Sequence, residues 1–191
     1  AAGTKYIFIS SYDTEVGGDL RFANSSDGGI TWSTTTIDST NNVGDFSSIY
    51  AVNSSIIYIS YYDSTNGYLR FANSSDGGQT WYTQAVDTTT AGGKGTSVKA
   101  INKSIILIAY DDSTNRDLKF ANSSDGGITW QKTAVVTANS PGERVSMAVI
   151  NRSIIYASGY EGQASGDIQF YNSSDGGKTW TTTRVVSANG D

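Results

Sequence analysis

The residue types best suited to chemistry are acids that recur at nearly constant spacing. These acids are Asp13, Asp63, Asp112 and Glu161, at spacings of 50, 49 and 49 residues. A tyrosine precedes three of them: Tyr12, Tyr62 and Tyr160. Carboxylates beside loop carbonyls could hold Ca²⁺, and an acid next to a tyrosine could bind sugar hydroxyls while the ring stacks on the sugar. The same acids could instead cap hairpin turns. Turn capping is favoured, ahead of sugar binding and then Ca²⁺, so we expect no cofactor.

Composition excludes several other kinds of chemistry. The 191 residues contain no cysteine, which excludes disulfides and thiolate metal sites, and no histidine, which removes the commonest general base. The formal net charge of −5 argues against nucleic acid as a partner. No apolar run approaches the roughly 20 residues of a membrane span. The polar, β-prone composition and the start at Ala1-Ala2-Gly3 lead us to expect a secreted or cell-surface protein.

The elements that must position these acids belong to a repeated unit. The phrase Ser-Ser-Asp-Gly-Gly-x-Thr-Trp occurs four times, at spacings of 49, 49 and 50 residues: Ser25–Trp32, Ser74–Trp81, Ser123–Trp130 and Ser173–Trp180. A fixed period of this size indicates one supersecondary unit that is copied and stacked. We therefore expect a single domain over residues 1–191, with repeats at about 1–38, 39–87, 88–136 and 137–191.

Each repeat is predicted to hold four strands, because its runs are short and rich in β-branched and aromatic residues. The first, small-residue strand is expected at Ser47–Val52, Thr96–Ile101 and Val145–Ile150, after loops at 39–44, 88–93 and 137–142. The second, apolar strand is expected at Tyr6–Tyr12, Ile56–Tyr62, Ile105–Asp111 and Ile154–Tyr160. The third is expected at Leu20–Ala23, Leu69–Ala72, Leu118–Ala121 and Ile168–Tyr171. The fourth is expected at Thr31–Ile37, Thr80–Val86, Thr129–Val135 and Thr179–Val185.

Four strands per unit of this length predict an all-β fold of β-propeller blades, with the first strand of each unit lining the channel. The first repeat lacks that inner strand, and an unpaired sheet edge invites another chain. Three explanations remain open. The chain could be a piece of a longer propeller, an oligomer could complete the blade, or Ala1–Thr4 could cover part of the gap.

The repeated phrase has a local structural logic. Its aspartate opens a turn, its glycines permit positive φ, its threonine can close the loop, and its tryptophan can begin the fourth strand and fill the space between sheets. The residues assigned this structural role are Ser25, Asp27, Gly29, Thr31 and Trp32; Ser74, Asp76, Gly78, Thr80 and Trp81; Ser123, Asp125, Gly127, Thr129 and Trp130; and Ser173, Asp175, Gly177, Thr179 and Trp180.

The four copies resemble the Asp-box, Ser-x-Asp-x-Gly-x-Thr-Trp, of the bacterial-neuraminidase (BNR) repeat family. The resemblance covers essentially the whole chain and implies a sialidase-like β-propeller, usually of six or more blades and usually secreted, with the box on a rim turn away from the ligand face. Sialidases of this family need an arginine triad, an acid/base aspartate and a tyrosine–glutamate pair. Only Arg116 and Arg144 fall near the expected ligand face, and the Phe-Arg-Ile-Pro motif is absent, so no catalytic residue is predicted.

Asparagine sequons form a further regular set. They lie on the face opposite the expected ligand face, at Asn24, Asn53, Asn73, Asn102, Asn122, Asn151 and Asn172. They could be glycosylated, or Asn-x-Ser could simply suit the turns.

The sequence as a whole favours a secreted, non-catalytic propeller for binding or assembly that recognises carbohydrate or a surface partner. The candidate binding residues are Tyr12, Asp13, Tyr62, Asp63, Asp112, Tyr160, Glu161, Arg116 and Arg144. Two alternatives remain: a fragment of a sialidase-like glycoside hydrolase whose catalytic residues lie elsewhere, and a structural subunit that self-associates through the open first blade.

Overall fold

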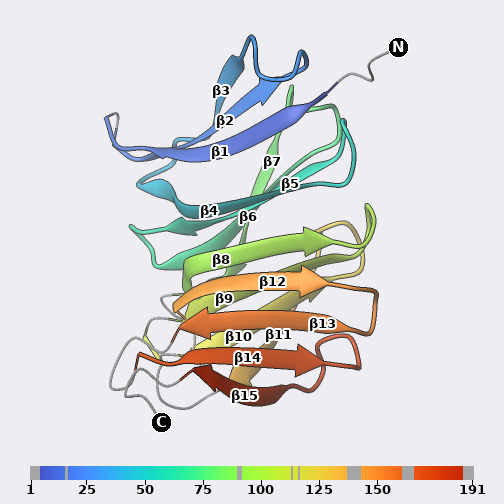
Figure 1. Ribbon diagram of the computed structural model, residues 1–191. Coiled ribbons are helices and arrows are strands. Elements are labelled where there is room, and N and C mark those ends of the chain that lie inside the picture. The colour runs from blue at the N-terminus through green and yellow to red at the C-terminus, as the bar shows by residue number, and fades with distance from the viewer. Residues whose placement is uncertain are drawn as a thin grey trace.

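The chain forms four antiparallel β-sheets that follow one another in sequence order (Figure 1). The computed structural model describes residues 5–15, 17–89, 92–112, 114–115, 117–136, 143–160 and 166–186. Every helix or strand assigned within these ranges is a β-strand, which confirms the all-β prediction. None of these residues belongs to a helix with the length and apolar character needed to cross a membrane.

The sheets reproduce the predicted repeat. The first contains β1 (Ile7–Asp13), β2 (Asp19–Ser25) and β3 (Ser33–Asp38), and the second contains β4 (Val43–Ala51), β5 (Ile57–Asp63), β6 (Tyr68–Ser74) and β7 (Tyr82–Asp87). The third contains β8 (Gly92–Ala100), β9 (Ile106–Asp112), β10 (Asp117–Ser123) and β11 (Gln131–Val136). The fourth contains β12 (Glu143–Val149), β13 (Ile155–Tyr160), β14 (Ile168–Ser173) and β15 (Thr181–Val186). Each sheet is an up-and-down meander, with β1 at one edge of the first.

Two sets of predicted strand bounds are wrong. The outer strands begin after the repeated tryptophans, at Ser33, Tyr82, Gln131 and Thr181, because each preceding threonine is held in the turn by its aspartate. The inner strands β4, β8 and β12 begin before the predicted starts, at Val43, Gly92 and Glu143. Bulges shift the register there, and glycines such as Gly44 (φ 107°) therefore looked like loop residues in the sequence.

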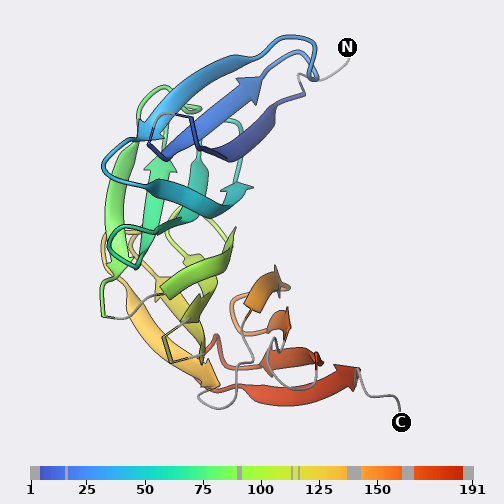
Figure 2. The ribbon, with the colours of Figure 1, turned by 90° about the vertical axis from the view of Figure 1, so that its left-hand side faces the viewer.

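The four sheets stand along an open arc (Figure 2), with the inner strands on its concave side and β3, β7, β11 and β15 on its convex side. We call the face of each sheet that is turned toward the next sheet its forward face, and the opposite one its rear face. An apolar cluster fills each of the three junctions between successive sheets. The first and fourth sheets lie at opposite ends of the arc, so the sheets do not close into a ring (Figure 2).

One aromatic contact recurs at every junction. A phenylalanine on the forward face of one sheet meets the repeated tryptophan of the next edge-on: Phe22–Trp81 at 4.9 Å, Phe71–Trp130 at 5.1 Å and Phe120–Trp180 at 5.3 Å between ring centroids. A Cβ added to Gly78, Gly127 or Gly177 would lie within 2.6 Å of the same phenylalanine ring. Glycine is therefore required at this position for two reasons, its positive φ and the ring that packs against it.

Candidate functional site

The repeated octapeptides form one identical hydrogen-bonded turn. In the third copy, Asp125 Oδ2 accepts from the Thr129 hydroxyl at 2.5 Å, while Oδ1 accepts from the Thr129 backbone N–H at 2.9 Å and from the Ser123 hydroxyl at 2.7 Å. These bonds, the Thr129 ones foremost, lower the pKa of Asp125 to about 2. The Trp130 indole N–H donates to the Gly127 carbonyl at 3.2 Å. These hydrogen bonds all lie within the turn itself, as expected of residues with a structural role.

The recurring acids at the ends of β5 and β9 are buried rather than presented to a ligand. Asp63 is inaccessible to solvent. It accepts from the backbone N–H groups of Thr65 at 3.1 Å and Asn66 at 3.0 Å, and from the Asn66 side chain at 2.9 Å. Asp112 repeats this pattern with Thr114 and Asn115. This arrangement is hairpin capping, the reading the sequence favoured.

Two buried clusters, which sequence reasoning missed, join the first three sheets. At the first junction, the Tyr61 hydroxyl donates to Asp38 Oδ2 at 2.7 Å, and Arg70 lies 3.2 Å from the same oxygen. At the second, Tyr110 donates to Asp87 Oδ2 at 2.8 Å, and Lys132 Nζ lies 3.0 Å from Oδ1. Burial and then the neighbouring carboxylates raise the pKa of both tyrosines. The recurrence of Asp38 and Asp87 at the repeat period was the signal available in the sequence.

The third junction has a different composition at these positions. Val136 replaces the aspartate and Gly159 replaces the tyrosine. Gln169 stands at the position of Arg70 and of Lys119, whose Nζ lies 3.7 Å from Asp87 Oδ2 at the second junction. Tyr171, which stands where β10 has Ala121, is fully buried and fills space at this junction instead. The third and fourth sheets therefore meet without the aspartate–tyrosine–cation cluster, and the Met147 backbone N–H donates to the Ser97 hydroxyl across this junction at 3.1 Å.

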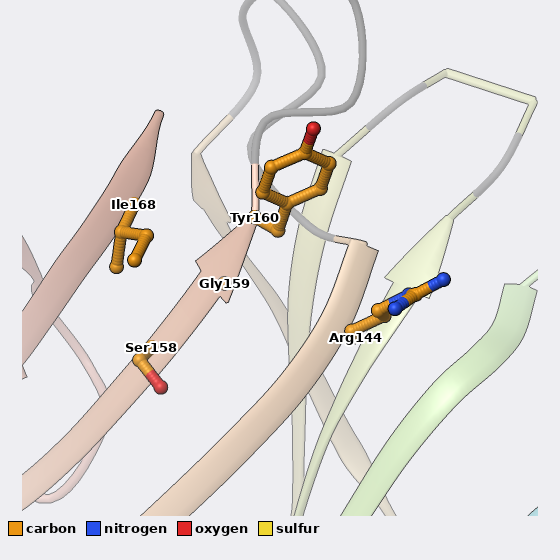
Figure 3. A pocket seen from close by; sticks show the side chains of 5 residues that line it. All are labelled: Arg144, Ser158, Gly159, Tyr160 and Ile168. Atoms are coloured by element: carbon orange, nitrogen blue, oxygen red, sulfur yellow. The ribbon is translucent and has the colours of Figure 1, made fainter. Parts of the chain in front are cut away.

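A hollow of about 400 Å³ lies on the forward face of the fourth sheet (Figure 3). The described residues that line it are Arg144, Ser158, Gly159, Tyr160 and Ile168. Arg144 has a positive φ of 56° in the bulge of β12, as do its equivalents Phe46 (52°) and Gly95 (70°). Its guanidinium forms no ion pair with any residue that the structure describes. A cation, a phenol and an apolar patch can bind a ligand, but the described part of the lining supplies no carboxylate for acid–base chemistry.

Among the described sheets none covers the forward face of the fourth, and the hollow lies on that face. Ile168 is 44% exposed, whereas its equivalents Leu20, Leu69 and Leu118 are fully buried. In the earlier sheets, the next inner strand covers that position so closely that a Cβ on Gly44 would lie 2.7 Å from Leu20 Cα. Ser158 corresponds to Ser10, whose hydroxyl bonds Ser47 of the next sheet at 2.9 Å, and to Ser60, which bonds Thr96. The hollow is thus one half of a sheet–sheet junction.

A second hollow, of about 410 Å³, lies at the other end of the arc on the first sheet. Its lining includes Tyr12, Asp13, Glu15 and Arg21. Asp13 lies 3.6 Å from Arg21, and the Tyr12 hydroxyl donates to Asn42 at 2.5 Å. The hollow lies where Ser11 replaces the buried ring of Tyr61 and Tyr110.

The remaining predicted site residues are not gathered in one place. Tyr62 is buried, with Lys94 Nζ at 5.9 Å from its ring centroid. Arg116 and Glu161 lie outside the described residues. Across the part of the chain that the structure describes, no three acidic side chains come together as a metal site. Asn53, Asn102 and Asn151 each accept two backbone N–H bonds in their own turns.

No protein-family profile matches the chain, and no curated protein matches it. Several solved structures do match the chain. The NanB sialidase of Streptococcus pneumoniae matches with a TM-score of 0.60 and 15% identity, over 88% of this chain and 32% of that one. A leech intramolecular trans-sialidase matches with a TM-score of 0.62 and 14% identity, over 89% and 29%. The intramolecular trans-sialidase of Ruminococcus gnavus matches with a TM-score of 0.62 and 12% identity, over 96% and 49%.

These likenesses show the fold alone, which is the sialidase type of β-propeller. The chain spans between 29% and 49% of the length of these three proteins.

Proposed function

We propose that this chain is a secreted, non-catalytic Asp-box β-propeller unit that serves in assembly and binds a protein partner through its open end faces. One observation carries the proposal: the forward face of the fourth sheet has the residues of a sheet–sheet junction, yet it is uncovered. Exposed apolar residues on an interface-like surface mark a site of protein association. Ile168, Tyr160 and Val185 supply such residues on the fourth sheet.

The same face favours protein over carbohydrate as the partner. Among its described lining residues the hollow offers one serine hydroxyl, one phenol and one guanidinium, and Ile168 and Val185 add exposed apolar surface of the kind that protein interfaces bury. Asp63 and Asp112, the acids best placed to bind sugar hydroxyls or Ca²⁺, already accept bonds from their own hairpins. We therefore propose that the protein works without a cofactor.

A tandem extension tests whether the open face accepts a further sheet. A second copy of residues 137–186 is appended after Val186, so that Val186 takes the place that Val136 has at the native third junction. We expect the added repeat to fold, with slow amide hydrogen exchange in its strands and a higher melting temperature than the parent chain. An added repeat that exchanges as fast as an unfolded peptide would refute the proposal. The matched control carries Ile168→Glu, which places a charge in the new junction and should leave the added repeat unprotected.

A second candidate function is favoured by the comparisons: part of a sialidase-like glycoside hydrolase that has its catalytic residues outside this chain. The segment shared with this chain makes up only 29–49% of the three sialidase structures, so the fold match leaves room for that arrangement. Turnover of a fluorogenic sialoside separates the two. We expect no hydrolysis by this chain at micromolar concentration, and hydrolysis that is lost in Arg144→Ala would place the chemistry here and overturn the first proposal.

A further inference from the structure

We propose that the junction between the third and fourth sheets binds a tetrahedral oxyanion, the sulfate or phosphate group of a small polar ligand. The site is a hollow of about 300 Å³ at the end of the junction where the octapeptide turns 123–130 and 173–180 lie. It lies between two sheets of the chain rather than on the open forward face of the fourth, so binding here is independent of the assembly function.

The hollow lies where the first two junctions have an aromatic ring. At the second junction this position is Tyr58, whose hydroxyl donates to the Lys103 carbonyl of the next sheet at 2.8 Å. At the first junction it is Phe8, which packs against the apolar cluster there. The third junction has Leu107 instead, and Leu107 lines the hollow. The smaller side chain therefore leaves a space that a ring fills in the other repeats.

Two cations border this hollow on the fourth sheet. Arg152 lies in the turn between β12 and β13, and Lys178 lies in the octapeptide turn between β14 and β15. Neither forms an ion pair with a residue that the structure describes. Asp175 also lines the hollow, but its carboxylate accepts bonds from the Ser173 and Thr179 hydroxyls in its own turn. Two cations and one carboxylate leave the described lining with one net positive charge.

Positive charge is not gathered at the equivalent places in the other junctions. The two cation positions hold Ser54 and Gln79 at the first junction, and Lys103 and Ile128 at the second. Counted with the octapeptide aspartate, these positions carry one negative charge at the first junction, none at the second and one positive charge at the third. The missing ring and the two cations therefore occur together at one junction, where the local field attracts an anion.

The two turns that carry the cations are fixed to each other. The Gly176 N–H donates to the Ser153 carbonyl at 2.9 Å, and a Cβ on Gly176 would lie 2.9 Å from the Arg152 carbonyl oxygen. The Asn151 side chain accepts from the N–H groups of Ser153 and Ile154 at 2.8 and 2.9 Å. Backbone held in this way is preorganised, which lowers the entropy cost of binding.

The remaining walls suit a polar ligand that carries the oxyanion. Guanidinium and ammonium groups are the side chains that bind sulfate and phosphate. The Asn122 amide and the Ser124 hydroxyl can donate further hydrogen bonds, and Ile105 and Leu107 add apolar wall. A volume of about 300 Å³ is at the lower end of the range of ligand pockets, so the ligand is a small one, of the size of a single sugar residue.

Isothermal titration calorimetry at low ionic strength tests the site with glucose 6-sulfate, glucose 6-phosphate, inorganic phosphate and neutral glucose. The protein is made in a host without N-glycosylation, because Asn122 begins one of the sequons. We expect at least one of the two esters to bind, glucose to give no heat, and the affinity to fall as salt screens the charges. Tighter binding of an ester than of inorganic phosphate identifies the ligand as a modified small molecule, and equal binding identifies it as the free ion.

The variants place in this junction the residues that other repeats have, so each is compatible with the fold. Arg152→Ser and Lys178→Ile remove one cation each, as at Ser54 and Ile128, and Leu107→Tyr fills the hollow with the ring of Tyr58 while both cations remain. We expect each variant to weaken binding at least about fivefold, because each removes a charge-assisted bond or the space for the ligand. Lys103→Ser removes the equivalent cation at the second junction and should bind as the unaltered chain does.

Two results would overturn the proposal. One is the absence of heat with all three anions. The other is binding that is unchanged in Leu107→Tyr, because the anion would then be attracted by exposed cations without entering the hollow. An unaltered melting temperature of each variant, followed by circular dichroism, shows that lost binding is not lost folding.

Discussion

Replacing Tyr110 with phenylalanine should weaken the junction between the second and third sheets in a pH-dependent way. The Tyr110 hydroxyl donates to Asp87 Oδ2 at 2.8 Å, and both side chains are buried. Burial alone raises the pKa of Asp87, but bonds from Thr89, Tyr110 and Lys132 outweigh it and lower the pKa from 3.8 to about 2. That difference corresponds to about 2 kcal/mol of stability from the ionised carboxylate.

The expected loss follows from the bond that disappears. A hydrogen bond to an ionised group contributes about 2 kcal/mol, so we expect Tyr110→Phe to lower the free energy of unfolding by about that amount at pH 7. Because the folded pKa of Asp87 lies below its unfolded value, the carboxylate stabilises the fold above about pH 4 and loses this effect as the pH falls toward 2. The difference between wild type and variant should therefore shrink to about 1 kcal/mol or less at pH 2.

Urea denaturation followed by tryptophan fluorescence, from pH 7 to pH 2, measures both effects. Tyr82→Phe is the matched control, because Tyr82 is 60% exposed and its loss should change stability by less than about 0.5 kcal/mol. Equal stability of Tyr110→Phe and wild type at pH 7 would refute the reasoning. So would a difference between them that stays constant down to pH 2, since the bond would then not depend on the charge of Asp87.

Three further predictions address the octapeptides, the hairpin acids and the sequons. The Gly127→Ala variant should be less stable than Gly17→Ala by about 1–3 kcal/mol in urea denaturation. Both glycines have φ near +90°, but only the Cβ added at position 127 would meet the Phe71 ring, at 2.6 Å. Equal losses of stability would mean that backbone strain alone matters. Calorimetric titration with Ca²⁺ should give no heat, because Asp63 is occupied by its own hairpin, and measurable binding that is lost in Asp63→Asn would contradict this assignment. Intact mass of material from a host with N-glycosylation should exceed the mass of the bare chain if the seven sequons are used, and a mass equal to the bare chain would exclude the modification.

The sequence predicted the repeat because it is encoded locally. Runs such as Ile56–Tyr62 are apolar at every position, and β5 is indeed buried along its whole length. The turn of the octapeptide is also local, since the described residues that bond Asp27 lie at most four positions away from it. Each of these features needs a single repeat to be recognised.

What the sequence left undetermined depends on how successive repeats face each other. Asp38 and Tyr61 lie 23 residues apart and belong to different sheets, so no local pattern shows that they meet. The same holds for Asp63, which lies 3.7 Å from Arg70, the cation that also pairs with Asp38 on the preceding sheet. The inner-strand bulges at Phe46 and Arg144 were missed because neither residue favours positive φ.

The unequal junctions have a mechanical consequence. The first three sheets are joined by buried aspartate–tyrosine–cation clusters, while the fourth is joined to the third without one. If the chain is pulled from its two ends, we expect the fourth sheet to detach first and the other three to yield later as a block. Under load the molecule would therefore lengthen in two steps, first by the fourth sheet alone and then by the remaining block of three.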